Sequence, residues 1–466
     1  MGRRPGAPEP ALGGTAAAID GVTAAATLTA RRPATARPPG PRTPRVWQTF
    51  RYQTDPVGYV EACRARYGPT FALRTHPRLV LAAAPADVQT VLTDQERFLA
   101  GPAAGGLKVV IGRHSVPVIP SGPQHRRRRR TMGPGLHAQH VKRWSDQIDE
   151  LAAACLARLP RDRPVATRPE LLHLSLDAVA RTLFPLEDPE RSEELGARVH
   201  RMMKPLVGVL MLSKSLQRDF GPVRPWSVFV RRRDAVDAFL YEEIAARRAT
   251  DPESRPRDVL SLLLAAGEDG EAPLSDREVR DELLGLLIPG YHTTGTALAW
   301  SFERLAHNPD VVARFRERVG SEEEDAYLDA VISEVLRTRP PVIDAVRLAT
   351  EDAELGGHLV RRGSLVAAMI YLAHHDPDAW PDPYAFRPER HLDGRSGAPT
   401  WIPFGGGTRR CIGASLGMLI MRRVLRAFLD QVTFEPPSDG TERARLHGPF
   451  MVPAREGRVI LRQRAA

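Results

Sequence analysis

The sequence predicts a mainly α-helical fold with a small β portion, arranged as one large domain over residues 46–466. Two long blocks of helical pattern, residues 125–250 and 275–339, make up much of the chain. β-like runs are short and lie before the first block and after the second. The chain shows no internal repeat, so a single domain fits this pattern better than several domains.

The composition excludes several classes of protein. Of the 466 residues 42% are apolar, which is enough for a substantial core. The net charge of +10 first suggests nucleic acid, but the arginines are scattered and show no nucleic-acid-binding motif, so we expect no such partner. Cys63, Cys155 and Cys411 are few, odd in number and far apart, which indicates a reducing, cytoplasmic compartment rather than a disulfide scaffold.

The first 45 residues differ from the rest of the chain. They are rich in Ala, Pro, Arg, Thr and Gly and contain no aromatic residue. Prolines and Asp20 interrupt any signal-peptide core, so we expect a disordered leader over residues 1–45, with an Arg-rich transit peptide as the alternative. No stretch approaches the roughly 20 apolar residues of a membrane span, and we predict none.

The remaining elements follow in order. A helix is expected over residues 59–67, and a pair of alternating strands over 70–75 and 79–84. After the second helical block, β-like runs are expected over 342–349 and 365–373, around a turn at Gly356-Gly357. A proline-dense stretch then leads to a glycine-rich loop around Cys411.

The second helical block begins with one unusually long helix. Ser275 and Glu278 form a predicted capping box, apolar residues continue to Leu305, and Pro309 ends the pattern. Thirty-odd residues span roughly 48 Å, which is long enough to cross the domain. Pro289 in the middle cannot donate a backbone hydrogen bond to the preceding turn, so we expect a bend there.

Cys411 is the most informative residue. It follows the run Gly405-Gly406-Gly407 and precedes an apolar helical segment, residues 414–429. Glycines allow positive φ and a close approach of the backbone to a bulky ligand, and a helix N-terminus favours thiolate over thiol. Such a sulfur suits an axial ligand of haem iron. The alternative is a buried structural cysteine beside a flexible turn.

Five positions of this loop, Phe404, Gly407, Arg409, Cys411 and Gly413, match the haem-binding signature of the cytochrome P450 family, which the chain resembles over residues 46–466. The resemblance implies the cytochrome P450 fold, with the long central helix crossing the domain over the haem. It implies haem b as cofactor, Cys411 as the iron ligand, and Phe404 and Gly413 in the cofactor loop. Without an apolar N-terminal anchor, the chain resembles the soluble bacterial members.

The middle of the long helix departs from the family pattern, which is a small residue, Gly, any residue, an acid, Thr and Thr. Gly290 and Thr293 match it, whereas Pro289 and His292 do not. The resemblance implies that Thr293 helps to deliver protons to the bound oxygen. His292 either transfers protons as a general acid in place of the family's acid or turns outward without a role. Without the resemblance, hydrogen bonding of the threonines to the preceding turn would be the simpler reading.

The resemblance also assigns the cations that bind the haem propionates. His125 and Arg129 match the family's His-x-x-x-Arg, one helical turn apart, and Arg347 and Arg409 match its other propionate contacts. We expect His125 and Arg129 to point inward from the arginine run. We expect Arg126, Arg127 and Arg130 to point outward. Together with Arg410 they would form a basic patch suited to an acidic ferredoxin.

A second motif supports the fold rather than the chemistry. Glu334 and Arg337 match the family's Glu-x-x-Arg, and Arg390 matches the arginine that completes a buried triad with that pair. The next residue is His391, where the family often has Phe. The resemblance therefore assigns these three charged residues to structure and haem retention.

The implied activity is that of a monomeric haem-thiolate monooxygenase. It inserts one oxygen atom from O2 into a lipophilic small molecule of bacterial secondary metabolism or lipid oxidation, with electrons from a ferredoxin and its reductase. The alternatives are oxidative coupling, desaturation or peroxygenase chemistry, and a non-catalytic haem-thiolate sensor or binder. By analogy the substrate pocket is lined by residues 98–121, 342–346 and 446–452 and by the 185–230 region, with Met202, Met203, Leu206 and Met211.

Overall fold

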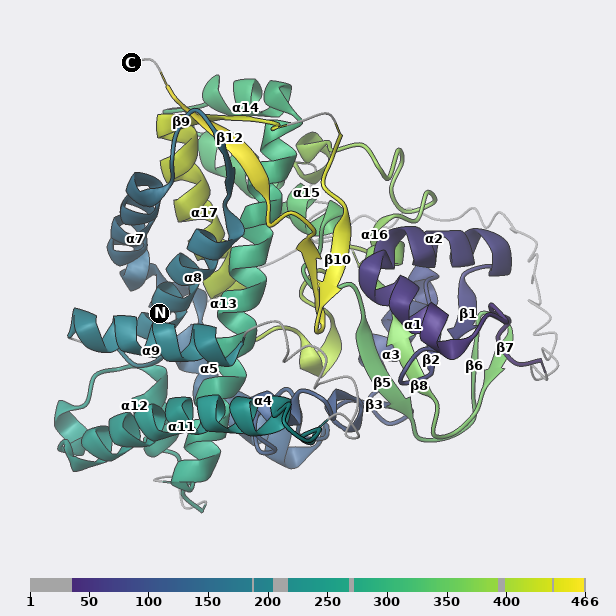
Figure 1. The fold of residues 1–466 in the computed structure, drawn as a ribbon, viewed down its shortest axis with the longest axis horizontal. Coiled ribbons are helices and arrows are strands. Elements are labelled where there is room, and N and C mark those ends of the chain that lie inside the picture. Colours follow the sequence, from purple (N-terminus) through teal and green to yellow (C-terminus); the bar gives the residue numbers. More distant parts are fainter. Residues whose placement is uncertain are drawn as a thin grey trace, which may run out of the picture.

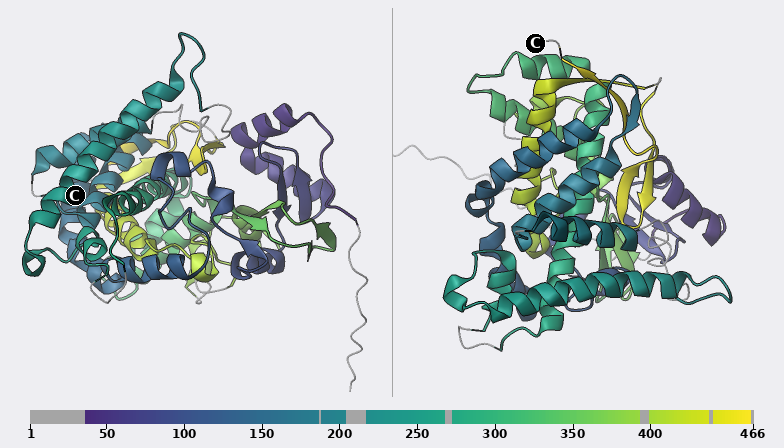
Figure 2. Two further views of the ribbon diagram at one scale, coloured as in Figure 1. Left: turned by 90° about the horizontal axis from the view of Figure 1, so that it is seen from below. Right: turned by 60° about the vertical axis from the view of Figure 1, so that its left-hand side comes forward.

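The computed structural model describes residues 36–464, except residues 187, 204–216, 268–271, 393–398 and 438–439. A large helix-rich part lies beside a smaller part that contains the main sheet (Figure 1), and two further views show the same division (Figure 2). The prediction of a mainly α-helical fold with a small β portion is confirmed.

The helices are α1 (Arg45–Thr54), α2 (Pro56–Tyr67), α3 (Pro85–Thr93), α4 (Lys108–Ile111), α5 (Pro123–Leu136), α6 (Ala138–Val141), α7 (Ser145–Arg158), α8 (Arg168–Leu183), α9 (Pro189–Met202), α11 (Pro225–Ala249), α12 (Val259–Leu264), α13 (Asp276–Ala306), α14 (Pro309–Arg316), α15 (Glu324–Thr338), α16 (Ile370–His374) and α17 (Ala414–Gln431). The strands are β1 (Thr70–Leu73), β2 (Leu79–Ala82), β3 (Phe98–Leu99), β4 (Pro164–Ala166), β5 (Ala345–Ala349), β6 (Ala353–Leu355), β7 (His358–Val360), β8 (Leu365–Ala368), β9 (Val432–Glu435), β10 (Ala444–His447), β11 (Phe450–Pro453) and β12 (Arg458–Gln463).

The main sheet has the strand order β1-β2-β8-β5-β3. Its first pair confirms the expected strands at residues 70–75 and 79–84, since Thr70 pairs with Ala82 in an antiparallel register. Strand β8 lies parallel to β2 and antiparallel to β5, so segments far apart in sequence meet in its centre. The predicted Gly356-Gly357 turn joins β6 to β7, and both glycines have a positive φ, of 54° and 76°.

The expectation of one β run over residues 365–373 is wrong in its second half. Strand β8 ends at Ala368, and α16 begins at Ile370. A short apolar run does not by itself distinguish a buried strand from a buried helix. Here Arg64 of α2 donates hydrogen bonds to the carbonyls of Leu372 and His375, which satisfies the free acceptors at the end of the helix.

The long helix α13 begins and ends where the sequence predicts. Ser275 and Glu278 form the capping box, the helix runs for 31 residues, and it ends before Asn308-Pro309. Pro289 lies inside the helix without ending it. Most of the helix is buried, because it forms part of the main hydrophobic core together with α8 and α17.

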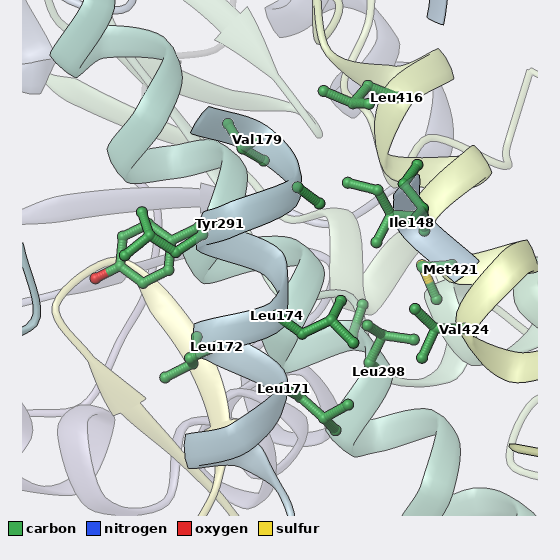
Figure 3. Packing of buried hydrophobic residues seen from close by; sticks show 14 of the residues in the cluster. Ile148, Leu171, Leu172, Leu174, Val179, Tyr291, Leu298, Leu416, Met421 and Val424 are labelled. Carbon is green, nitrogen blue, oxygen red and sulfur yellow. The ribbon is translucent and has the colours of Figure 1, made fainter. Parts of the chain in front are cut away.

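The core around α13 is drawn in Figure 3. Apolar side chains of α8 pack against α13 on one side and meet side chains of α7 and α17 on the other. Gly295 of α13 permits this contact, because a Cβ there would lie 2.8 Å from the Leu171 carbonyl oxygen of α8. The labelled side chains are Ile148, Leu171, Leu172, Leu174, Val179, Tyr291, Leu298, Leu416, Met421 and Val424.

Residues 36–44 lie along the main sheet and its hairpin. The Ala72 amide donates to the Pro39 carbonyl at 2.7 Å, and the Leu359 amide donates to the Ala36 carbonyl at 2.9 Å. The expected leader over 1–45 overlaps this segment, while residues 1–35 lie outside the described part, so its extent stays a prediction. Among the described helices, none combines the length and apolar character that a membrane crossing requires.

Candidate active site

The loop that carries Cys411 is shaped by two of its glycines. Gly405 and Gly407 have a positive φ, of 68° and 61°, which favours glycine. A Cβ on Gly407 would lie 2.8 Å from the Leu92 carbonyl oxygen of α3, so this glycine also permits a close approach. The Cys411 amide donates to the Phe404 carbonyl at 2.8 Å and closes the loop, after which α17 begins.

Cys411 differs from the other two cysteines in its surroundings. Cys63 and Cys155 are buried, and burial raises the pKa of their thiols to about 11 and about 12. The Cys411 sulfur has protein atoms on most sides, yet it stays accessible. Burial raises the Cys411 pKa, and this outweighs the lowering by the Gly413 N–H group and by the nearby Arg129 and Arg410. The helix N-terminus alone therefore does not create the expected thiolate, and a bound metal cation would supply the missing positive charge.

Three arginines and one histidine gather next to this loop. They are His125 and Arg129 of α5, Arg347 of β5, and Arg409 of the cysteine loop. Burial and the charges of Arg409, Arg129 and Arg126 lower the pKa of His125 to about 4. Burial lowers the pKa of Arg347 to about 10, and burial with the charges of Arg347 and Arg129 lowers that of Arg409 to about 10. The three guanidinium cations thus repel one another, and the His125 imidazole beside them is neutral at pH 7.

This cationic cluster has no negative partner in the described part of the chain. None of the four residues forms an ion pair there, and two of their buried nitrogens, His125 Nε2 and Arg347 Nε, have no hydrogen-bond partner. Arg409 donates to the carbonyls of Val116 and Ile119 at 2.8 and 2.6 Å and to the Ser121 hydroxyl at 3.0 Å. Three guanidinium charges without a counter-charge favour the binding of an anion, and the two propionates of haem fit this requirement.

The middle of α13 presents one accessible face. Leu286, Pro289, Gly290 and Thr293 are half-buried, whereas their neighbours along the helix are buried. Their spacing places them on one side of the helix. Thr293 therefore lies on the face that can contact a ligand. Its hydroxyl donates to the Pro289 carbonyl at 2.9 Å, which is the alternative contact that the sequence suggests, and its lone pairs remain available as acceptors.

His292 lies beside that face and is only 2% exposed. Its Nε2 atom is 3.3 Å from a guanidinium nitrogen of Arg168, and its ring stacks on those of Phe450 and His447, with centroid distances of 4.2 and 5.6 Å. Burial, followed by the charges of Arg168 and His447, lowers the His292 pKa well below its ordinary value. The imidazole is therefore neutral at pH 7, which disfavours a proton held for general acid catalysis.

The charged triad beneath the site forms as predicted. The Glu334 carboxylate accepts hydrogen bonds from Arg337 at 2.7 and 2.8 Å and from Arg390 at 3.2 Å. His391 adds a contact of 3.0 Å from its Nε2 atom, so the departure from the family's Phe completes the cluster. Burial opposes ionisation, but these hydrogen bonds and the Arg337 charge lower the Glu334 pKa to about 2.

Sequence reasoning missed the role of Arg128. This residue is buried and forms ion pairs with Glu278 and, at 4.0 Å, with Glu282, both on α13. Its position three residues after His125 on the same helix face is the signal that could have revealed it. Arg126 and Arg130 are exposed as expected, whereas Arg127 is half-buried and donates to the Ala272 carbonyl.

The residues expected to line the substrate pocket differ in their burial. Met202 is fully buried in the main core, and Met203 is half-buried against it. Leu206 and Met211 lie outside the described residues. Of the segment 446–452, Phe450 stacks on His292 and so reaches α13.

Comparisons with known proteins agree with this geometry. The family model described as cytochrome P450 matches residues 38–461. The chain is 36% identical to cytochrome P450 135B1 of Mycobacterium tuberculosis, covering 91% of both chains, and 35% identical to cytochrome P450 137 of the same species, covering 85% and 84%. A retinoic acid bound cyanobacterial CYP120A1 shares the fold, with a TM-score of 0.80 at 24% identity over 92% of this chain and 99% of that chain. The chain belongs to the cytochrome P450 family.

Proposed function

We propose that this chain is a haem-thiolate monooxygenase that binds haem b between the Cys411 loop and the accessible face of α13. The observation that carries the proposal is the cationic cluster, which gathers three guanidinium cations and the neutral His125 imidazole beside an accessible thiol. Members of the cytochrome P450 family carry haem and are monooxygenases, which supports this assignment.

Each site residue has a separate proposed role. Cys411 provides the iron ligand, and the Gly413 N–H group, Arg129 and Arg410 reduce its pKa from what burial alone would give. His125, Arg129, Arg347 and Arg409 bind the propionates, while Phe404 and Gly413 shape the loop. When bound, haem would supply the iron chemistry that activates dioxygen for insertion of one oxygen atom into a C–H or C=C bond. Thr293 holds and passes a proton through its hydroxyl on the substrate side.

The proposed substrate is a lipophilic small molecule of secondary metabolism or lipid oxidation. Leu286 and Pro289 give the accessible face of α13 an apolar character, and the strand β11 brings Phe450 to the same helix. Retinoic acid, which occupies the structural relative CYP120A1, is a lipophilic carboxylic acid and illustrates the class. A screen for ligand-induced spin-state shifts would identify the compound.

The proposed electron donor is a ferredoxin, reduced by its reductase. Arg126, Arg130 and Arg410 are exposed, and they lie on the two segments that also carry the cationic cluster and the thiol. Their charges complement an acidic partner and place it near the cofactor. Arg127, the fourth residue of the expected patch, is half-buried, so the name basic patch is used below for Arg126, Arg130 and Arg410.

Replacing Cys411 tests the central assignment. We expect Cys411→Ser to abolish the absorption band of a thiolate-bound, CO-treated reduced haem, because serine does not provide a thiolate ligand. Cys155→Ala, which removes a buried thiol, is the matched control and should keep the band. An unchanged band in Cys411→Ser would refute the assignment.

Turnover then separates the enzyme from its alternatives. NADH consumption through ferredoxin and its reductase, linked to an oxygenated product, supports the monooxygenase. Product formed only with added peroxide would indicate a peroxygenase instead. A thiolate spectrum without any turnover on compounds that shift the spin state would indicate a sensor or carrier.

A further inference from the structure

The N-terminus of α8 carries a buried arginine that contacts three side chains, one in the turn between β11 and β12 and two on α13. Arg168 is 6% exposed. It forms an ion pair with Glu456 in the turn between β11 and β12, and its Nε donates to the Thr296 hydroxyl of α13 at 3.2 Å. Its remaining guanidinium nitrogen contacts His292 Nε2 at 3.3 Å. This residue has no part in the function described above.

The backbone holds Arg168 in this place. Its amide donates to the Glu456 carbonyl at 3.0 Å, and the preceding Thr167 donates through its hydroxyl to the Gly457 carbonyl at 2.8 Å. Gly457 has a φ of 66°, and a Cβ there would lie 3.0 Å from the side chain of Ala299 of α13. The turn is therefore packed tightly between the start of α8 and the long helix.

The contact with His292 has only one chemical direction. A guanidinium group has no acceptor, so Arg168 must donate and His292 Nε2 must accept. In a neutral imidazole the proton is then on Nδ1. His292 Nδ1 is buried and has no hydrogen-bond partner among the described residues. Its proton is therefore held inside the protein beside α13, without an acceptor from another described residue.

The groups around His292 also oppose its protonation. Arg168 faces it from α8 and His447 faces it from β10, while the flanking Phe450 and Tyr291 rings are uncharged at neutral pH. The acid nearest to Arg168 is Glu456, which also accepts from Arg445 at 2.8 Å. Two arginines therefore share this carboxylate, and little negative charge remains to favour an imidazolium.

We propose that Arg168 is a positioning residue that fixes His292 as a neutral imidazole with its proton on Nδ1. This inference rests on the proposed function and deepens it. Where the family pattern has an acid, this chain offers a fixed hydrogen-bond donor that does not titrate near neutrality. The donor suits an oxygen acceptor, supplied by water or by a polar group of the substrate.

Nitrogen-15 NMR of histidine-labelled, reduced CO-bound protein tests the proposal directly. His292 is assigned by comparison with His292→Gln. We expect an Nδ1–H tautomer that does not change from roughly pH 6 to 8. In Arg168→Met we expect mixed tautomers and a His292 pKa that rises by about one pH unit or more, because the nearest cation is gone. Arg168→Lys keeps the charge and should keep the low pKa.

Two further variants keep the test decisive. The double variant Arg168→Met, Glu456→Gln removes both charges of the ion pair. It replaces Arg168→Met in the NMR test if the single variant does not fold. Arg445→Met removes the other partner of Glu456 without touching His292 and should leave the Nδ1–H tautomer of His292 unchanged. A wild-type ring that carries its proton on Nε2, or that titrates near neutrality, would overturn the proposal. Unchanged His292 signals in Arg168→Met would do so as well.

A second readout links the proposal to function. The peroxide released per NADH should have no His292-dependent pH profile in the wild type. In Arg168→Met the peroxide released per NADH should become dependent on pH. Adding His292→Gln to this variant should remove that dependence. The NMR result does not require turnover and is obtained with haem-free protein too, so its failure is distinguishable from a failure of the monooxygenase assignment, which the CO-bound spectrum reports.

Discussion

At the scale of single residues, the main finding is a set of buried and half-buried arginines without counter-charges. Arg347 is 8% exposed, and its described side-chain hydrogen bond goes to the adjacent Val346 carbonyl, at 3.1 Å. A buried charge without a partner costs free energy in the folded protein. The same charge gains a partner when a dianionic cofactor binds. The cluster should therefore be unfavourable before the cofactor binds and favourable afterwards.

This reasoning predicts opposite effects of one substitution. Arg347→Gln should leave the melting temperature of the haem-free protein unchanged or raise it, because a desolvated charge is removed. The same variant should lose haem at least about tenfold faster, since hydrogen bonds to charged groups contribute roughly 1.5–3 kcal/mol. Calorimetry and the transfer of haem to apomyoglobin measure the two quantities. Arg361→Gln, which removes an exposed arginine paired with Asp352, is the control and should change neither. A haem-free protein that melts lower with Arg347→Gln would contradict the explanation.

At the scale of elements, the Glu334 cluster ties α15 to the segment before the cysteine loop. Glu334 and Arg337 have side chains with no exposed surface, and Arg337 also donates to the carbonyls of His374 and Pro383 at 2.7 and 2.8 Å. Arg390 and the Arg387 amide bind the same carboxylate from the other side. One carboxylate therefore organises three segments of chain, so removing it leaves several buried donors without a partner.

The cluster predicts a defined loss of stability in acid. The Glu334 pKa in the folded protein, about 2, is lower than its ordinary value of 4.5. The carboxylate therefore contributes stability that is fully present above roughly pH 5 and is lost as the pH falls toward 2. Glu334→Gln should lower the free energy of unfolding by about 3–5 kcal/mol at pH 7 and flatten the stability profile in this acid range. Urea unfolding from pH 7 to pH 3 measures both.

An exposed carboxylate provides the comparison. Glu435 pairs with Arg462 on the surface, where both side chains are close to half-exposed. Glu435→Gln should change the free energy of unfolding by less than about 1 kcal/mol and leave the acid profile as in the wild type. If Glu334→Gln behaved like Glu435→Gln, the cluster would not be the source of acid sensitivity.

Elements with a local signal could be predicted from the sequence, and elements decided by packing could not. The capping box at Ser275 marks the start of α13 without knowledge of the fold. In contrast, the apolar residues 365–373 suit a strand or a buried helix equally, and the helix at their end is held by contacts from distant segments, such as the hydrogen bonds from Arg64 and Arg337. Likewise, five consecutive arginines look alike in the sequence, and the inward position of Arg128 follows from the carboxylates of α13.

The same division applies to the candidate site. The pattern around Cys411 predicts the loop and its glycines, because the backbone conformation at Gly405 and Gly407 restricts the residue type. The environment of His292 could not be predicted, since it depends on Arg168 and Phe450, which are distant in sequence. Thr293 lies on the accessible face as expected, and its chemical role stays a prediction.

At the scale of the whole molecule, the arginine charges fall into two groups, those in ion pairs and those exposed in the basic patch. The net charge of +10 comes from arginines throughout the chain, and many of them form ion pairs within the structure. The basic patch of Arg126, Arg130 and Arg410 is exposed on the segments that carry the proposed haem ligands. Exposed charges act mainly on association rates, and salt screens them within about 8–10 Å.

Charge reversal in this patch predicts a specific kinetic change. Arg126→Glu with Arg130→Glu should raise the KM for ferredoxin by about tenfold or more at low salt and leave peroxide-driven activity and the CO-bound spectrum unchanged. The difference from the wild type should shrink as the salt concentration rises. Arg458→Glu, an exposed change on β12, should keep the wild-type KM. An equal loss in all salt concentrations would indicate damage to the fold instead of a docking surface.

The double duty of α13 has a consequence for engineering this protein toward new reactions. The accessible face of α13 is narrow, and the rest of the helix is part of the central core. The face consists of Leu286, Pro289, Gly290 and Thr293. Substitutions on this face that change the space for the substrate would also disturb the packing of the helix in the core. Variant libraries aimed at altered selectivity are therefore better placed outside α13, for example at residues 102–109, which are exposed or half-buried.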